Sequence, residues 1–231
     1  MPTHRDAWAS LWESKMTYRA VLFDLDGTLL DTLEDLADAM NAVLTAEGLP
    51  THPTDAYRHF VGDGIVNLVR RALPADRRDE TTLERLVAAD REEYARRWDR
   101  KTRPYEGVPR LLDGLTGRGL RLAILSNKPD DSTRLCVEKL LPGWSFDAVQ
   151  GVAEGVPLKP DPAGALGIAR RLGVAPGSFL YVGDTATDMR TAVGAGMFPV
   201  GALWGFRDAD ELTAAGAQSL LVHPAELLDL L

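Results

Sequence analysis

The 231-residue sequence has a single cysteine, Cys136, and no long hydrophobic run. One cysteine excludes an intrachain disulfide and favours a reducing compartment, where we expect Cys136 to be a core residue on a helix. No apolar stretch approaches the roughly 18 residues that a membrane span needs, and the first residues show no continuous apolar segment of the signal-peptide kind. These absences predict a cytoplasmic protein with no membrane partner.

Basic residues are too few to suggest a nucleic-acid partner. The chain holds 26 lysines and arginines against 34 aspartates and glutamates, which leaves a net charge of -8 at pH 7. Such a surface repels the phosphate backbone of DNA or RNA. With 45% hydrophobic residues the chain can bury a substantial core, and its length predicts one large domain or a domain with an insert.

Short apolar runs and helical patterns alternate from Gly107 to the end of the sequence. The apolar runs are continuous, which is typical of parallel strands covered by helices on both faces. We expect strands at 18–23, 120–127, 147–151, 179–184, 198–203 and 218–222, and helices at 107–119, 132–141, 162–173, 186–196, 208–216 and 224–231. This pattern predicts an α/β fold with a doubly wound, Rossmann-like parallel sheet.

Residues 33–103 interrupt this alternation. They carry helical patterns at 33–48, 64–73 and 80–99, with no convincing strand pattern between them. Because the strand at 18–23 needs partners from beyond residue 103, the intervening helices must leave the sheet and return to it. We therefore expect a catalytic core of residues 18–32 and 104–231, an inserted all-helical cap domain at 33–103, and an N-terminal extension at 1–17.

Polar side chains follow the predicted strands. They are Asp24 and Asp26 after the first strand, Ser126 and Asn127 at the end of 120–127, and Asp184 and Asp188 at and after the end of 179–184, with Lys159 in a proline-stiffened loop. Ligands of an open parallel sheet bind at the carboxyl ends of its strands, so these residues should meet. Buried carboxylates cost several kcal/mol unless a cation or hydrogen-bond donors compensate them.

This set of residues suits phosphoryl chemistry. Three converging carboxylates can hold Mg2+, which lets a dianionic phosphate approach an acidic site. Lys159, the Ser126 hydroxyl and the backbone N–H groups of the turn after Asp24 would surround the phosphoryl oxygens. The sequence has no P-loop, so we expect a covalent aspartyl-phosphate, with Asp26 as the general acid and base.

Four segments in this order, FDLDGTLLDT, LSNK, LKPD and GDTATD, resemble the signatures of the haloacid dehalogenase superfamily. The resemblance implies that Asp24 is the nucleophile and a metal ligand. It implies that Asp26 is the acid/base residue and also ligates the metal through its backbone carbonyl, and that Asp184 is the third ligand. The remaining assignments are phosphate binding for Ser126 and Lys159 and supporting roles for Asn127 and Asp188.

Within the superfamily the chain is most similar to phosphoglycolate phosphatases, because of its helical insert and the segments VGDGIVNLVRRAL and YEGV. This similarity implies a magnesium-dependent hydrolase of a small phosphorylated metabolite, 2-phosphoglycolate in the first place. We expect the protein to act as a monomer or homodimer. The cap would close on hinges near 30–33 and 101–105. Phosphomutases, pyrophosphatases and sugar-phosphate phosphatases share the architecture, and a receiver-type signalling domain is an alternative that Asp26 argues against.

Several of these residues also have a structural interpretation. Ser126 and Asn127 could cap a helix, and Asp188 could interact favourably with the dipole of the helix in whose first turn it lies. The glycines at 62–64 could form a helix-entry turn rather than a loop at the site. The histidines are expected to lie on the surface or to be structural, and Trp204 and Phe206 are expected to pack against the core.

Overall fold

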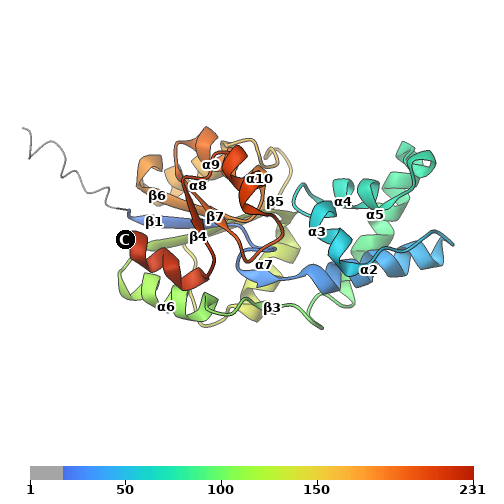
Figure 1. Cartoon of the computed structure of the whole chain (residues 1–231), viewed down its shortest axis with the longest axis horizontal. Coiled ribbons are helices and arrows are strands. Elements are labelled where there is room, and N and C mark those ends of the chain that lie inside the picture. The colour runs from blue at the N-terminus through green and yellow to red at the C-terminus, as the bar shows by residue number, and fades with distance from the viewer. Residues whose placement is uncertain (1–17) are drawn as a thin grey trace, which may run out of the picture.

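The computed structural model describes residues 18–231, so the predicted N-terminal extension lies outside the described residues (Figure 1). A six-stranded parallel sheet has the order β5-β4-β1-β6-β7-β8. The strands are β1 (Ala20–Phe23), β4 (Arg121–Pro129), β5 (Ala148–Val152), β6 (Phe179–Gly183), β7 (Phe198–Ala202) and β8 (Ser219–Leu221). The chain runs outward from β1 to one edge and then to the other, which confirms the doubly wound fold.

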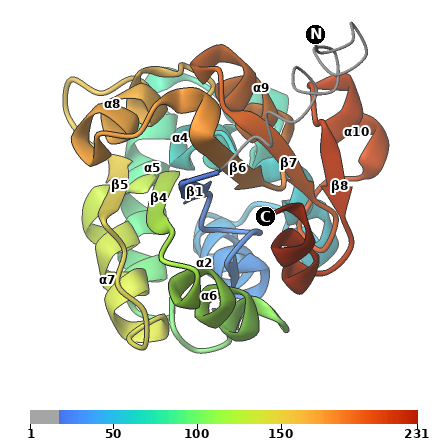
Figure 2. The same cartoon turned by 90° about the vertical axis from the view of Figure 1, so that its left-hand side faces the viewer.

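Helices cover both faces of this sheet. Figure 2 shows α8 (Ala163–Leu172) and α9 (Ala186–Ala195) on one side of the strands, with α6 (Val108–Gly117) and α7 (Asp130–Leu140) on the other. Successive side chains of β1 enter different clusters, since Val21 and Phe23 pack in one hydrophobic core and Ala20 and Leu22 in the other. Burial on both faces explains why the strands are continuously apolar.

Four helices lie together beyond one end of the sheet (Figure 1), and we call them the helical unit. They are α2 (Leu33–Ala46), α3 (Tyr57–Phe60), α4 (Ile65–Ala72) and α5 (Glu80–Ala95), with short 3-10 turns at Thr54–Ala56 and Ala75–Arg77. The unit has its own hydrophobic cluster, in which Tyr57 and Leu86 are fully buried. Phe206, from the loop after β7, joins this cluster across the boundary.

The chain crosses between sheet and helical unit through a two-stranded ribbon that the sequence did not reveal. In it β2 (Leu30–Asp31) pairs antiparallel with β3 (Arg103–Pro104). Beside the ribbon, the Asp35 carboxylate accepts hydrogen bonds from the backbone N–H groups of Lys101 and Thr102 at 2.9 and 2.8 Å. The two crossings are thus tied to each other at the segments where the hinges were predicted.

Most other elements match their predicted ranges to within a few residues. Helix α7 begins at Asp130, two residues before its predicted start, and carries the buried Cys136. The C-terminal helical segment, Pro224–Leu230, is of the 3-10 type, and α10 (Ala209–Ala214) packs beside α9. Within residues 18–231, no helix is both long and apolar enough to span a bilayer.

Candidate active site

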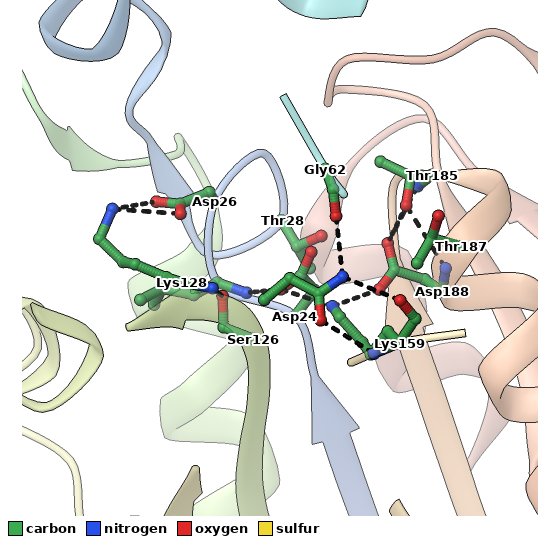
Figure 3. A network of polar contacts seen from close by, with 12 residues as sticks. Asp24, Asp26, Thr28, Gly62, Ser126, Lys128, Lys159, Thr185, Thr187 and Asp188 are labelled. Atoms are coloured by element: carbon green, nitrogen blue, oxygen red, sulfur yellow. Dashed lines mark hydrogen bonds and ion pairs between the residues drawn. The ribbon is translucent and has the colours of Figure 1, made fainter. Parts of the chain in front are cut away.

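Segments far apart in the sequence meet at the carboxyl ends of β1, β4 and β6 (Figure 3). Lys159, from the loop between β5 and α8, lies with its Nζ 2.9 Å from Asp24 Oδ1 and 2.6 Å from Asp188 Oδ1. One carboxylate oxygen from each of Asp24, Asp184 and Asp188 lies within 4.8 Å of the others. The predicted convergence of Asp24, Asp184, Asp188 and Lys159 is therefore present.

The turn after Asp24 depends on glycine for its shape. Gly27 has a φ of 85°, and a Cβ added there would lie 2.3 Å from Asp184 Oδ2. This close approach places the next residue, Thr28, where its hydroxyl donates to Asp184 Oδ1 at 2.9 Å. The backbone N–H of Phe206 donates to Asp184 Oδ2 at 2.9 Å. Asp184 is thus held from two segments while its side chain is fully buried.

The buried carboxylates repel one another. Burial and the charge of Asp188 raise the pKa of Asp24 well above its ordinary value, against the opposing effect of Lys159. Burial is the main cause that raises the pKa of Asp184 to about 7, and the charge of Asp188 is the second. A divalent cation at this point would relieve the repulsion, and a set of carboxylate oxygens is the donor chemistry that Mg2+ prefers. The residues present therefore fit such an ion.

Asp188 lies both at the site and at a helix N-terminus, the two positions that its functional and structural interpretations predicted. Its Oδ2 accepts hydrogen bonds from the backbone N–H and the hydroxyl of Thr185 at 3.1 and 2.6 Å, which completes a capping box at the start of α9. Its Oδ1 accepts from Lys159 Nζ at 2.6 Å. The helix N-terminus thereby orients a carboxylate that in turn positions the lysine.

Ser126 and Asn127 do not cap α7, whose N-cap is Pro129, so that structural alternative is wrong. The Asn127 amide instead holds the loop of Lys159, because Oδ1 accepts from the Lys159 N–H at 2.9 Å and Nδ2 donates to its carbonyl at 3.1 Å. Ser126 Oγ accepts from the backbone N–H of Lys128 at 3.2 Å, which leaves its own proton available to a ligand.

A cavity of about 720 Å3 separates this cluster from the helical unit. Asp24, Asp26 and Ser126 line it from the sheet, and Asp90 and Tyr94 line it from α5. The cavity thus joins the carboxyl edge of the sheet to residues of the insert.

A family model described as haloacid dehalogenase-like hydrolase matches residues 21–202. The chain belongs to this family. Its match to the phosphoglycolate phosphatase of Rhodospirillum rubrum is 35% identical over 220 residues, covering 91% of this chain and 90% of the relative. The phosphoglycolate phosphatase of Pseudomonas putida (strain KT2440) is 35% identical over 201 residues, covering 85% and 73%. A crystal structure from Lactobacillus delbrueckii subsp. bulgaricus has a TM-score of 0.87 at 30% identity, covering 92% of this chain and 98% of that one.

These matches confirm the predicted family and enzyme class. The chain is a hydrolase of the haloacid dehalogenase-like family, and its sequence is phosphoglycolate phosphatase-like. The individual roles that the resemblance assigns to Asp24, Asp26, Ser126, Lys159 and Asp184 stay predictions, to which the geometry adds contacts.

Within this hydrolase site, the carboxylate of Asp26 lies apart from the other three (Figure 3). Each of its oxygens lies 3.2 Å from Lys128 Nζ, which also donates to the Tyr94 hydroxyl at 2.8 Å. Burial lowers the pKa of Lys128, but the charge of Asp26 outweighs this effect and holds the pKa above its ordinary value. The lysine is therefore charged. The metal contact of Asp26 through its backbone carbonyl stays a prediction.

Lys128 and Tyr94 are the residues that sequence reasoning missed. Lys128 stands in the LSNK segment and is the only lysine within β4, so a cation at the end of an apolar strand was a usable signal. Tyr94 lies in a helix with a weak apolar face and offered no such signal.

The backbone amides of the turn after Asp24 are mostly occupied. The N–H groups of Gly27, Thr28, Leu29 and Leu30 donate within the turn, and that of Leu25 donates to Asp24 Oδ1. Within the described residues, only the N–H of Asp26 in this turn has no acceptor. The expectation of several phosphate-binding amides is therefore corrected to one, because closing the tight turn uses the others.

The loop at Val61–Gly64 contacts the site. The Gly62 carbonyl accepts from Asn127 Nδ2 at 3.1 Å, and Asp63 Oδ1 accepts from the Thr187 hydroxyl at 2.6 Å. Partial burial raises the pKa of Asp63, but the hydrogen bonds from Thr187 and Arg71 outweigh this effect and hold the pKa below its ordinary value. The loop is therefore more than a helix-entry turn.

Aromatic and histidine side chains outside the cluster have structural contacts. Trp204 Nε1 donates to the Thr28 carbonyl at 2.9 Å, whereas Phe206 packs in the helical unit rather than the sheet core. His52 Nε2 lies 2.8 Å from the Ala72 carbonyl oxygen, and His223 caps the last helical segment. These contacts agree with the predicted structural roles, except that Phe206 serves the other cluster.

Proposed function

We propose that this hydrolase is a magnesium-dependent phosphatase that transfers the phosphoryl group of a small monoester first to Asp24 and then to water. The observation that carries this proposal is the cluster of Asp24 with Lys159 and two further buried carboxylates, at the edge of a cavity that Asp24 and Ser126 line. We propose 2-phosphoglycolate as the substrate, which is supported by the names of the relatives.

The contacts of Asp24 indicate which oxygen attacks. Its Oδ1 accepts from the Leu25 N–H at 2.7 Å and pairs with Lys159. No hydrogen bond within the described residues ends on Oδ2, so this oxygen is available as the nucleophile. In this proposal Ser126 and the free N–H of Asp26 donate to the phosphoryl oxygens, which stabilises their developing charge.

The reaction then divides into two balanced steps. Asp24 Oδ2 bonds to phosphorus as the ester P–O bond breaks, and the leaving oxygen takes a proton from the Asp26 carboxyl. The resulting Asp26 carboxylate takes a proton from water, whose oxygen bonds to phosphorus and releases Asp24 and inorganic phosphate. Because Asp26 faces Lys128 in the structure, its carboxyl must turn toward the leaving oxygen.

Magnesium, when bound by Asp24, Asp184 and the backbone carbonyl of Asp26, would neutralise charge on the site and on the phosphate. Asp188 stays a supporting residue in this proposal, since Thr185 and Lys159 already engage both of its oxygens.

We further propose that residues 33–103 act as a cap on a core of 18–32 and 104–231. The helical unit supplies one wall of the cavity, and β2 and β3 are the two connections on which it would close. Closure would exclude water from the aspartyl-phosphate. A cytoplasmic location is supported by the single cysteine, and a monomer or homodimer is the expected form.

The test is phosphate release from 2-phosphoglycolate, pyrophosphate and hexose phosphates, with and without magnesium. Turnover should require magnesium and be highest with 2-phosphoglycolate. Asp24→Asn should abolish turnover and leave the circular dichroism spectrum unchanged, whereas Asp229→Asn, on the exposed C-terminal segment, should leave turnover intact. Asp24→Asn retaining more than about a tenth of wild-type activity would contradict the covalent role. Isomer formation from a hexose phosphate without phosphate release would favour a phosphomutase.

A further inference from the structure

Lys128 is a buried cation to which the proposed mechanism gives no part. Only 5% of its side chain is exposed, yet it lines the same cavity as Asp24 and Ser126. A buried ammonium is stable only where its donors are satisfied. Its hydrogen bonds therefore show what the site offers a ligand.

The contacts of Lys128 leave one donor unused beside it. An ammonium has three N–H groups and no acceptor. In the structure its three contacts go to the two Asp26 oxygens and to the Tyr94 hydroxyl, so a further anion binds the ammonium only by displacing Asp26. Because the Tyr94 oxygen accepts from Lys128, its own O–H is free to donate, and it has no acceptor among the described residues. A free hydroxyl donor thus lies beside an exchangeable ion pair at the cavity wall.

Asp90 borders the same cavity one helical turn before Tyr94. Its Oδ1 is buried and has no hydrogen-bond partner within the described residues. Burial raises the pKa of Asp90 to about 7, so near neutral pH much of this carboxyl is uncharged and able to donate a hydrogen bond. Protonation of Asp90 therefore lessens the negative charge that the helical unit presents to an anion bound at Lys128.

We propose that Lys128 and Tyr94 form a subsite for a carboxylate of the substrate, carried on the carbon next to the phosphate ester. The subsite and the phosphoryl position share one cavity, which Asp24, Ser126 and Lys128 all line, and the Lys128 ammonium lies 3.2 Å from the carboxylate of Asp26, two residues after Asp24. A short substrate that carries both groups would occupy the two positions together. This inference rests on the proposed phosphatase function and assigns its preference for 2-phosphoglycolate to particular residues.

The subsite also couples recognition to catalysis. A substrate carboxylate on Lys128 competes with Asp26 for the same ammonium. Once Asp26 is released from this pair, its carboxyl can turn toward the leaving oxygen. An ester without a carboxylate leaves Asp26 paired with Lys128, so the substrate carboxylate should raise kcat as well as lower KM.

The experiment compares 2-phosphoglycolate with ethyl phosphate, which has a methyl group in place of the carboxylate. The wild-type protein should prefer 2-phosphoglycolate, and Lys128→Met should reduce the ratio of the two kcat/KM values about 10- to 100-fold. Tyr94→Phe, which removes one hydroxyl, should reduce it about 2- to 10-fold. Lys139→Met is the matched control, because among residues 18–231 this exposed lysine on α7 pairs only with Glu138, and its ratio should be that of the wild type.

The ratio separates recognition from a merely positioning role. If Lys128→Met slows both esters equally, Lys128 only orients Asp26 and the subsite is refuted while the phosphatase function stands. Should Lys128→Met fail to fold, Tyr94→Phe decides, and an unchanged ratio in that variant refutes the proposal.

Binding to the inactive Asp24→Asn protein gives a second measurement. By calorimetry it should bind 2-phosphoglycolate more tightly than ethyl phosphate, and adding Lys128→Met should remove this difference. Equal binding of both esters in the two proteins refutes the subsite alone. Binding of neither ester counts against the proposed function itself.

Discussion

Adding one methyl group at Gly27 tests whether the turn after β1 determines the position of Asp184. The residue has a φ of 85°, and a Cβ would lie 2.3 Å from Asp184 Oδ2 and 2.8 Å from Phe206 Cδ2. The left-handed backbone costs an alanine about 1–2 kcal/mol, and overpacking against a buried carboxylate and ring adds about 1–3 kcal/mol. Gly27→Ala should therefore lower the free energy of unfolding by about 2–5 kcal/mol.

Gly48→Ala is the matched control for this variant. Gly48 also has a left-handed backbone, with a φ of 66°, but no atom lies within 4 Å of an added Cβ. Gly48→Ala should lower the free energy of unfolding only by the backbone contribution, about 1–2 kcal/mol. Urea denaturation followed by circular dichroism measures both losses, and a phosphate-release assay should show reduced activity for Gly27→Ala alone. Equal losses of stability and activity in the two variants would refute the steric argument.

Two further predictions concern the helical unit and its contact with α9. Burial raises the pKa of Asp90 to about 7, so the folded state holds this proton more tightly than the unfolded state. The contribution of this proton to the free energy of unfolding is complete below about pH 4 and is lost as the pH rises through 7. The urea midpoint should accordingly fall between pH 5 and 8, and fall less in Asp90→Asn; equal slopes would contradict the assignment. Thr187→Val removes the 2.6 Å hydrogen bond to Asp63 and should raise KM about 2- to 10-fold, whereas the exposed Thr213→Val should not. An unchanged KM in Thr187→Val would show that this contact does not hold the loop over the substrate.

The parallel sheet could be predicted because each of its strands is buried on both faces. The apolar run 179–184 became β6 and the run 198–203 became β7, each with a helix where the 3.6-residue pattern indicated one. The ribbon of β2 and β3 could not be predicted, because a two-residue strand has no periodicity. Its pairing depends on a partner more than 70 residues away in the sequence.

Part of the site could also be predicted, because it follows from where the parallel strands end. Asp24 and Asp184 each directly follow a buried strand, and adjacent parallel strands bring such residues to one edge. Lys159 was predicted from its loop, but its contact with Asp188 depends on how α9 begins.

The amino-acid sequence by itself determined which residues end the strands, and hence which carboxylates share the site. Only the tertiary structure decided that Asp26 pairs with Lys128 and that Tyr94 completes this pair. The physical reason is that a strand end is a local property of the chain. The distance from Lys128 to a tyrosine of α5 is set by the packing of the helical unit over the sheet.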